Sequence, residues 1–251
     1  MSLQDKVVVV TGGGTGIGLG IAGALWKSGC RVIITGRRKD KLIEAKQVLL
    51  TEKPVDQAAE GHFMTECCDV ANRGQVEEVF GKIRGSHGQV DILVNCAGTN
   101  IVNRTMAEMT PEQWDEVLSI NATGAYNCMH QVLPSMRKNK SGLIINVSSI
   151  AGKRALALGG IAYAASKFAM TALGTAVGNE VAADGVKITN VYPGEVNTPI
   201  LEKRPVEVSD QQKSVMVQPE DIGKLVVAVA ELPPRAHVPE LIIKPTVQEY
   251  V

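Results

Sequence analysis

A tyrosine and a lysine four residues apart have the residue types and spacing best suited to chemistry in this chain. Tyr163 and Lys167 fall in a stretch from about residue 161 to residue 183 that we predict to be helical, so their side chains share one face. A nearby ammonium favours phenolate over phenol, and a phenol with a free pKa of about 10 transfers protons better as its pKa falls. The pair indicates a general acid and base; a chance pairing on a helix surface is the alternative.

Two further polar groups belong to elements that should lie near this pair. Residues 143–147 form a mostly apolar run typical of a buried strand, and Ser148 and Ser149 follow at its carboxyl end. Asn121 interrupts the apolar pattern of a helical region that starts at Thr110-Pro111 and reaches residue 138. A buried amide is costly unless it is hydrogen-bonded, so Asn121 either serves a site or is satisfied structurally.

A glycine-rich turn near the start of the chain predicts a nucleotide site. Four valines at residues 7–10 favour a buried parallel strand, the motif Thr11-Gly12-x-x-x-Gly16-x-Gly18 follows, and residues 19–28 are predicted to be helical. Such a turn needs dihedrals that a Cβ resists, and an approaching phosphate needs bare backbone. The N-terminus of a helix also favours a pyrophosphate. A turn that only allows close packing of helix and strand is the alternative.

The end of the second predicted strand, residues 31–35, indicates which dinucleotide binds. The strand runs into Gly36-Arg37-Arg38, and no acid precedes Asp40. An acid in this region accepts the ribose 2′-OH of NAD, whereas an arginine accommodates the 2′-phosphate of NADP. We therefore predict NADP(H) in preference to NAD(H), with Arg37 as the main contact and Arg38 as a helper. Solvated arginines at a helix start are the alternative.

Strands and helices alternate along the rest of the chain, which predicts an α/β fold. The strand at residues 63–68 ends at Asp69, a candidate for the adenine edge or for capping the next helix. The strand at residues 91–94 ends in Asn95-Cys96-Ala97-Gly98, whose small residues permit close approach of a cofactor.

The last part of the chain contains a further expected strand, a helix and a final strand, at residues 186–191, 219–231 and 240–243. Between them, residues 195–218 contain two prolines and lie just past a strand end. We predict that this segment is a loop or short-helix lid over the substrate.

Composition narrows the class of protein. The 251 residues show no break in composition, which predicts one domain over residues 1–251. The 26 basic residues balance the 26 acidic ones, so nucleic acid and anionic membranes are not expected partners. We expect a soluble cytoplasmic protein without a signal peptide, because the N-terminus runs straight into a strand and no apolar run spans a membrane. Five cysteines without a C-x-x-C motif predict buried reduced thiols and no metal site.

In order and spacing, these motifs resemble those of the short-chain dehydrogenase/reductase family over nearly the whole chain. The matching positions are the glycine turn, Asp69, Asn95-x-Ala97-Gly98, Asn121, Ser148-Ser149, Tyr163-x-x-x-Lys167 and Pro193-Gly194. The resemblance implies one Rossmann-type doubly wound domain, with a seven-stranded parallel sheet and helices on both faces. It also implies an NADP(H)-dependent oxidoreductase that interconverts a ketone and a secondary alcohol, and a homo-oligomer, either tetramer or dimer.

The resemblance also implies a catalytic tetrad of Asn121, Ser149, Tyr163 and Lys167. Tyr163 would exchange a proton with the substrate oxygen that Ser149 holds. Lys167 would depress the pKa of the tyrosine and bind the nicotinamide ribose, and Asn121 would position a water that relays protons to Lys167. Ser148 remains an alternative, because the interval from Ser149 to Tyr163 is one residue longer than is usual in the family.

Cofactor contacts carry over in the same way. In chain order they are Gly12, Thr15, Gly16, Ile17, Gly18, Arg37, Arg38, Asp69, Val70, Asn95, Ala97, Gly98, Tyr163, Lys167, Pro193, Gly194, Val196 and Thr198. Thr198 is expected to meet the carboxamide.

The substrate is left open between several classes. Many family members have Thr-Gly before the last strand and a glycine pair after it, whereas this chain has Val238-Pro239 and Lys244-Pro245. This ending resembles the branch of broad-specificity hydroxy-acid and serine dehydrogenases, and Arg154 is a candidate for a substrate carboxylate. A 3-oxoacyl thioester reductase is a further alternative. An NADP-sensing module without turnover is the non-enzyme alternative, which the presence of both Tyr163 and Lys167 disfavours.

Overall fold

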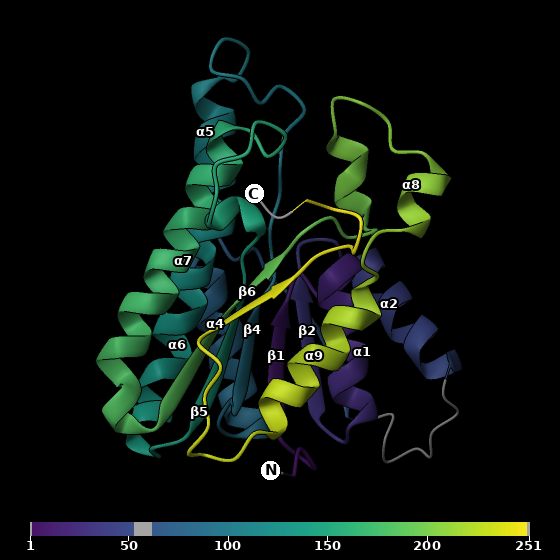
Figure 1. The fold of residues 1–251 in the computed structure, drawn as a ribbon. Helices are drawn as coiled ribbons and strands as arrows, with labels where there is room; N and C mark the ends of the chain where they lie inside the picture. The colour runs from purple at the N-terminus through teal and green to yellow at the C-terminus, as the bar shows by residue number, and fades with distance from the viewer. Residues whose placement is uncertain (1, 53–61, 250–251) are drawn as a thin grey trace.

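The computed structural model describes residues 2–52 and 62–249, and a parallel sheet runs through its centre (Figure 1). Seven strands lie in the order β3-β2-β1-β4-β5-β6-β7. They are β1 (Val7–Thr11), β2 (Arg31–Gly36), β3 (Phe63–Cys67), β4 (Ile92–Asn95), β5 (Gly142–Val147), β6 (Val186–Pro193) and β7 (Glu240–Ile243). All neighbouring pairs are parallel, which confirms the predicted doubly wound α/β fold.

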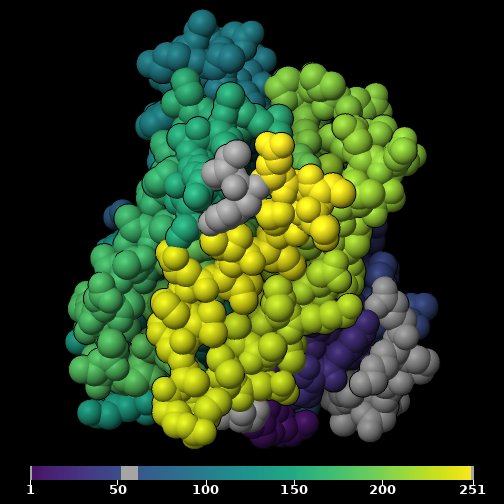
Figure 2. Space-filling model, in the orientation of Figure 1, coloured from purple at the N-terminus to yellow at the C-terminus, as the bar shows by residue number. Residues whose placement is uncertain are grey.

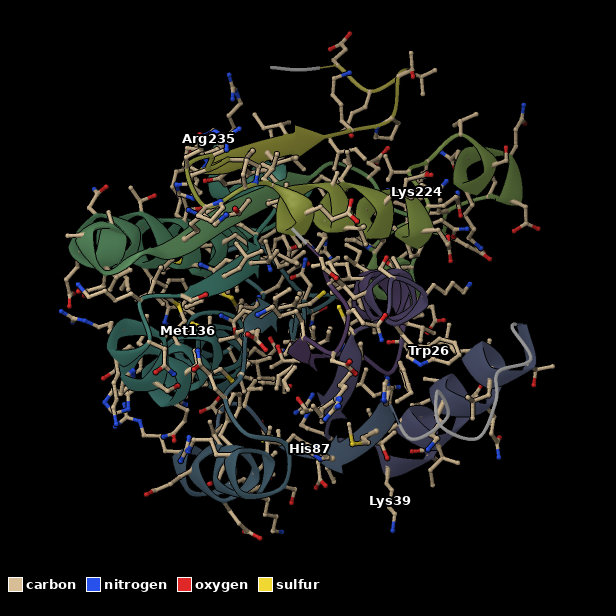
Figure 3. All side chains as sticks on the ribbon, turned by 90° about the horizontal axis from the view of Figure 1, so that it is seen from below. Trp26, Lys39, His87, Met136, Lys224 and Arg235 are labelled. Carbon is tan, nitrogen blue, oxygen red and sulfur yellow. The ribbon has the colours of Figure 1, made fainter. Side chains whose placement is uncertain are left out.

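Helices cover both faces of the sheet. One layer holds α1 (Gly16–Lys27), α2 (Lys39–Glu52) and α9 (Pro219–Glu231), and the other holds α4 (Arg73–His87), α6 (Gly124–Lys138) and α7 (Ile161–Val181). Successive strand residues point to opposite faces, so Val8 and Val10 join one core and Val7 and Val9 the other. Figure 3 shows Trp26 of α1 and Met136 of α6 on opposite sides of the strands.

The helix starts follow local capping chemistry. The helix α5 (Pro111–Leu118) begins with a capping box between Thr110 and Gln113, as the Thr-Pro signal predicted. The cap of α4 is Asn72, whose side chain accepts a hydrogen bond from the backbone of Gln75. The suggestion that Asp69 caps α4 is therefore wrong; its carboxylate instead accepts from the Ala71 N–H at 3.0 Å.

The predicted helical region from residue 110 to residue 138 is interrupted at Asn121. A π-helical turn, η1 (Ser119–Thr123), connects α5 to α6 and contains this buried residue. Such turns are frequent at functional sites, because they turn a residue out of the regular helical pattern.

The segment from residue 195 to residue 218, called the lid segment below, contains the short helices η4 (Pro199–Lys203) and α8 (Asp210–Ser214). Its two ends lie side by side, because Val196 pairs with Val217 and the Asn197 N–H donates to the Val217 carbonyl at 2.9 Å. Residues 53–61, between α2 and β3, lie outside the described residues.

Gly20 in α1 and Gly223 in α9 allow the backbones of these two helices to come into contact. A Cβ at Gly223 would lie 2.6 Å from the carbonyl oxygen of Gly20 and 2.9 Å from the Cβ of Ala24. By contrast, a Cβ at Gly81 in α4 would meet nothing within 4 Å.

We predict that Gly223→Ala lowers the free energy of unfolding by about 1–3 kcal/mol, because the helices must separate to admit the methyl group. The matched substitution Gly81→Ala should raise it by up to about 1 kcal/mol, since alanine is the better helix former. Urea unfolding of the two variants measures both effects. Equal shifts in the two variants would contradict the close α1–α9 contact.

Candidate active site

A cavity of about 570 Å³ opens at the carboxyl ends of the strands. The strand order reverses between β1 and β4, which is where ligands bind in open α/β sheets. Its walls come from the glycine turn, the ends of β2, β4 and β5, the helix α7 and the lid segment. The volume is in the range of small-molecule sites, which run from about 300 to 1,000 Å³.

The glycine turn brings the ends of β1 and β4 into direct contact. Gly12 has a φ of +66°, and a Cβ there would lie 2.8 Å from the Cα of Ala97. The hydroxyl of Thr11 accepts hydrogen bonds from the backbone N–H groups of Cys96 and Ala97 at 3.0 and 3.1 Å. Glycine is needed at residue 12 both for its backbone conformation and for this approach.

The start of α1 is suited to an anion. Thr15 makes no side-chain cap, and the first turn of α1 contains no acid, whereas Asn72 and Thr110 cap α4 and α5. The residues of this first turn, Gly16, Ile17 and Gly18, line the cavity. Their free N–H groups and the positive end of the helix dipole at this wall of the cavity are suited to a phosphate group. Arg37 and Arg38 are exposed and line the same cavity. The residues present therefore fit a phosphate-bearing dinucleotide.

Tyr163 and Lys167 project from α7 into this cavity. Lys167 is 4% exposed, its Nζ donates to the Val147 carbonyl at 2.8 Å, and it lies 5.6 Å from the centre of the Tyr163 ring. Burial lowers the pKa of Lys167 to about 8. Burial also raises the pKa of Tyr163, and the hydrogen bond with Ser149 offsets this only in part. The predicted downward shift of the tyrosine pKa is therefore wrong here, because desolvation of the phenolate dominates.

The two serines after β5 have different environments. Ser148 is buried, and its hydroxyl lies 3.0 Å from the Lys167 carbonyl, to which it donates, and 3.2 Å from the hydroxyl of Thr171. Ser149 is half-buried, its hydroxyl accepts from the Ala151 N–H at 3.1 Å, and it lowers the pKa of Tyr163 in part. Because the Ser148 hydroxyl is engaged by the Lys167 carbonyl and by Thr171, Ser149 is the better candidate for the partner of the tyrosine.

Most predicted site residues line the cavity, but two asparagines lie behind its wall. Of the predicted cofactor contacts, all except Asn95 line it, and so do Ser149, Tyr163 and Lys167 of the predicted tetrad. Asn95 donates to the side chain of Asn146 at 2.9 Å, within the sheet.

Asn121 uses its amide to join two elements. It accepts from the Thr99 N–H at 2.8 Å and donates to the Thr99 carbonyl and the Ser166 hydroxyl at 3.0 and 2.9 Å. Both amide donors are thereby used by the protein itself. Its predicted role in holding a water stays a prediction.

The cavity also contains residues that the sequence analysis did not single out. Lys41, Arg104, Lys203, Arg204 and Gln248 line it, whereas Arg154, the predicted receptor for a substrate carboxylate, does not. Lys41 extends the basic cluster of Arg37 and Arg38, a signal that was present in the sequence. The others lie in short or irregular segments, where no periodic pattern points to a site.

The chain belongs to the short chain dehydrogenase family, whose model matches residues 6–208. This confirms the resemblance and the oxidoreductase class. An uncharacterized oxidoreductase of Staphylococcus saprophyticus is 33% identical over 246 residues, which cover 98% of this chain and 99% of that protein.

Two solved structures have similar folds along their whole length. An alcohol dehydrogenase from the archaeon Thermococcus sibiricus, complexed with 5-hydroxy-NADP, has a TM-score of 0.84 and 27% identity, covering 99% of this chain and 100% of its own. The closed form of a serine dehydrogenase complexed with NADP⁺ has a TM-score of 0.85 and 28% identity, covering 97% of this chain and 96% of its own.

Within the described residues of this chain, no helix has the length and apolar character needed to span a membrane. The same residues contain no metal-binding group of three or more His, Cys, Asp or Glu side chains.

The cysteines are not all buried as predicted. Cys30, Cys68 and Cys128 are buried, Cys96 is half-buried and lines the cavity, and Cys67 is exposed beside the Arg37 carbonyl. Burial raises the pKa of Cys30 and Cys96 to about 12 and that of Cys68 to about 11, and it also raises the pKa of Cys128.

We predict that one thiol per chain, Cys67, reacts rapidly with Ellman's reagent in the native protein at pH 8. A raised pKa leaves the other thiols largely protonated, and the thiolate is the reactive form. All five should react in denaturant, and Cys67→Ser should abolish the fast phase. A fast phase that survives this substitution would contradict the assigned burial.

Proposed function

We propose that this protein is an NADP(H)-dependent oxidoreductase that interconverts a ketone and a secondary alcohol, with Tyr163 as acid and base. The observation that carries the proposal is that Tyr163, Lys167 and Ser149 line the same cavity as the uncapped start of α1. A proton-transfer group therefore shares one cavity with a site for dinucleotide phosphates.

The substrate carbonyl is held between Ser149 and Tyr163. A bound NADPH supplies the hydride for the carbonyl carbon. The Tyr163 hydroxyl donates its proton to the carbonyl oxygen, and the Ser149 hydroxyl donates a hydrogen bond to the same oxygen. In the reverse direction, the Tyr163 phenolate accepts the proton of the alcohol.

The pKa directions bear on which form of Tyr163 is present near neutral pH. Because burial raises the pKa of Tyr163, its phenol keeps the proton that reduction requires. Oxidation of an alcohol needs the phenolate, and the positive charge of Lys167 stabilises that form as it develops. Lys167 would also hold the nicotinamide ribose, with its Nζ oriented by the Val147 carbonyl.

The arginines after β2 support a preference for NADP(H) over NAD(H). Arg37 and Arg38 line the cavity, and the nearby Lys41 pairs with Glu44 at 2.6 Å. Guanidinium groups form paired, charge-assisted hydrogen bonds to phosphate. NADP(H) carries a phosphate at the ribose 2′ position, whereas NAD(H) carries a hydroxyl there. The NADP of the similar solved structures supports the same choice.

The remaining expectations concern class and assembly. Two narrower substrate classes are a hydroxy acid and a thioester. Similarity to a serine dehydrogenase favours the hydroxy acid over the thioester. A homo-oligomer, tetramer or dimer, is proposed because the apolar side chains of Tyr126 on α6 and Phe168 on α7 are 45% and 42% exposed. The cytoplasmic location stays a prediction.

We predict that Tyr163→Phe lowers kcat for NADPH-dependent ketone reduction about 10²–10⁴-fold, because it removes the proton donor. Tyr126→Phe, the same change on α6, should leave kcat unchanged, because Tyr126 does not line the cavity and the substitution keeps the apolar ring that a subunit contact would use. Absorbance at 340 nm follows the reaction, and NADPH fluorescence checks that cofactor binding is retained. Near wild-type reduction by Tyr163→Phe would refute the assignment.

We predict that Arg37→Ala raises KM for NADPH about 10–100-fold, the loss expected for a charged hydrogen bond, while KM for NADH changes little. Arg235→Ala serves as the control, because Arg235 is exposed on the loop before β7 (Figure 3) and does not line the cavity. Equal effects of Arg37→Ala on both cofactors would contradict recognition of the 2′-phosphate.

A further inference from the structure

The cavity is more positive than the chain as a whole. Among the described residues, seven cationic side chains and three carboxylates line it, whereas the chain has a formal net charge of zero. Arg37, Arg38 and Lys41 account for the cofactor end, and Lys167 belongs to the catalytic pair. Three cations, Arg104, Lys203 and Arg204, remain without a role in the proposed function.

Arg104 is buried without a carboxylate. Arg104 is 8% exposed. Its guanidinium donates hydrogen bonds to the carbonyls of Ile101, Leu158 and Lys203 at 3.0, 2.6 and 2.5 Å. Within residues 2–52 and 62–249, no acid lies within ion-pair distance of it. A guanidinium has five N–H donors, so two are unused by these three carbonyls. A buried charge is costly unless it is paired, which suggests that an anion completes this environment.

Arg104 faces the catalytic end of the cavity. Its charge acts on the Tyr163 phenol, and burial together with the charge of Arg204 lowers the pKa of Arg104. Thr99, which follows Gly98 after β4, connects Lys203 to the same end of the cavity. Its hydroxyl accepts a hydrogen bond from the Lys203 Nζ at 3.3 Å, and its backbone N–H donates to the Asn121 side chain.

Lys203 and Arg204 differ in how their charges are balanced. Arg204 pairs with Glu195 at 2.7 Å, so its charge is neutralised within the lid segment. Lys203 is exposed, and its only side-chain partner in the described part of the chain is the neutral Thr99 hydroxyl. Its ammonium is therefore solvated and available to a ligand, whereas the charge of Arg104 is buried. The third carboxylate of the cavity, Glu202, is exposed and pairs with neither of them. Two cations, Arg104 and Lys203, are thus left without an acidic partner.

We propose that Arg104 and Lys203 bind the carboxylate of an oxo-acid substrate, whose carbonyl lies at Tyr163 and Ser149. This inference rests on the proposed function and selects the substrate class within it. The carboxylate is unchanged in the reaction: the hydride goes to the carbonyl carbon and one proton to its oxygen, which gives the hydroxy acid and NADP⁺. A neutral ketone or a thioester leaves both cations unpaired.

The positions of the two cations are set by the fold. Arg104 bonds to the backbone carbonyl of Lys203, so the loop after β4 and η4 of the lid segment are joined. At the start of the lid segment, the Glu195 N–H donates to the side chain of Gln248 at 3.0 Å. Figure 2 shows the C-terminal segment, in yellow, against the light-green lid segment. The Arg104 guanidinium and the backbone of Lys203 are therefore held in place before substrate binds, while the exposed Lys203 side chain extends from that fixed backbone.

Lys203→Gln is the discriminating variant. It removes the ammonium but keeps the backbone carbonyl that Arg104 requires, whereas substitution of Arg104 would also break three loop contacts. Lys213→Gln is the matched control, because Lys213 lies on α8 of the same lid segment, pairs with Asp210 and does not line the cavity.

The substrates are 2-oxo and 3-oxo acids, each compared with its methyl ester, and NADPH is the hydride donor. For the wild type, kcat/KM should be at least about tenfold higher for the best acid than for its ester. Lys203→Gln should raise KM for that acid about tenfold, the loss of one charge-assisted hydrogen bond, and leave the ester within about twofold. Lys213→Gln should change neither.

A binding measurement separates this inference from the proposed function. Calorimetric titration of each acid and ester into the protein loaded with NADP⁺, which provides no hydride, should show tighter binding of the acid and loss of that difference in Lys203→Gln. Equal binding or turnover of acid and ester in the wild type overturns the carboxylate site and leaves the oxidoreductase intact. Selective binding of the acid without turnover of any carbonyl supports the carboxylate site and refutes the proposed reaction.

Discussion

The contact between the ends of β1 and β4 is the constraint on which the site depends. Gly12 allows its backbone to approach Ala97, and the Thr11 hydroxyl holds the two strand ends together. Because the strand order reverses between these strands, their following segments diverge and leave a cavity above the sheet. The glycine turn and the helix α7, which carries Tyr163 and Lys167, therefore border one space, although about 150 residues separate them in sequence.

Desolvation controls the chemistry of the groups in that space. It lowers the pKa of Lys167 to about 8 and raises that of Tyr163, so each group is shifted toward its neutral form. In the proposed reaction, negative charge that develops on the substrate oxygen would be met by the Ser149 hydroxyl and by the buried Lys167, whose ammonium the Val147 carbonyl orients.

The lid segment is closed on itself and anchored at two places. Val196 and Val217 join its own two ends. Arg104 binds the carbonyl of Lys203, and Gln248 accepts from the backbone of Glu195, so the two anchors come from the loop after β4 and from the C-terminal segment. Side chains of the lid segment consequently take defined positions relative to Tyr163, and specificity for a charged substituent becomes possible.

Local patterns in the sequence determined the alternation of strands and helices, the glycine turn and the shared face of Tyr163 and Lys167. These depend on neighbouring residues and on the periods of strand and helix, which a sequence displays directly. Tertiary structure decided the rest. The Ser148 hydroxyl is engaged by the Lys167 carbonyl, Asn95 turns into the sheet, and Arg104 contacts the Lys203 carbonyl across 99 residues of chain. Burial also reversed the expected pKa shift of Tyr163, because the desolvation of a group depends on what the whole fold packs around it.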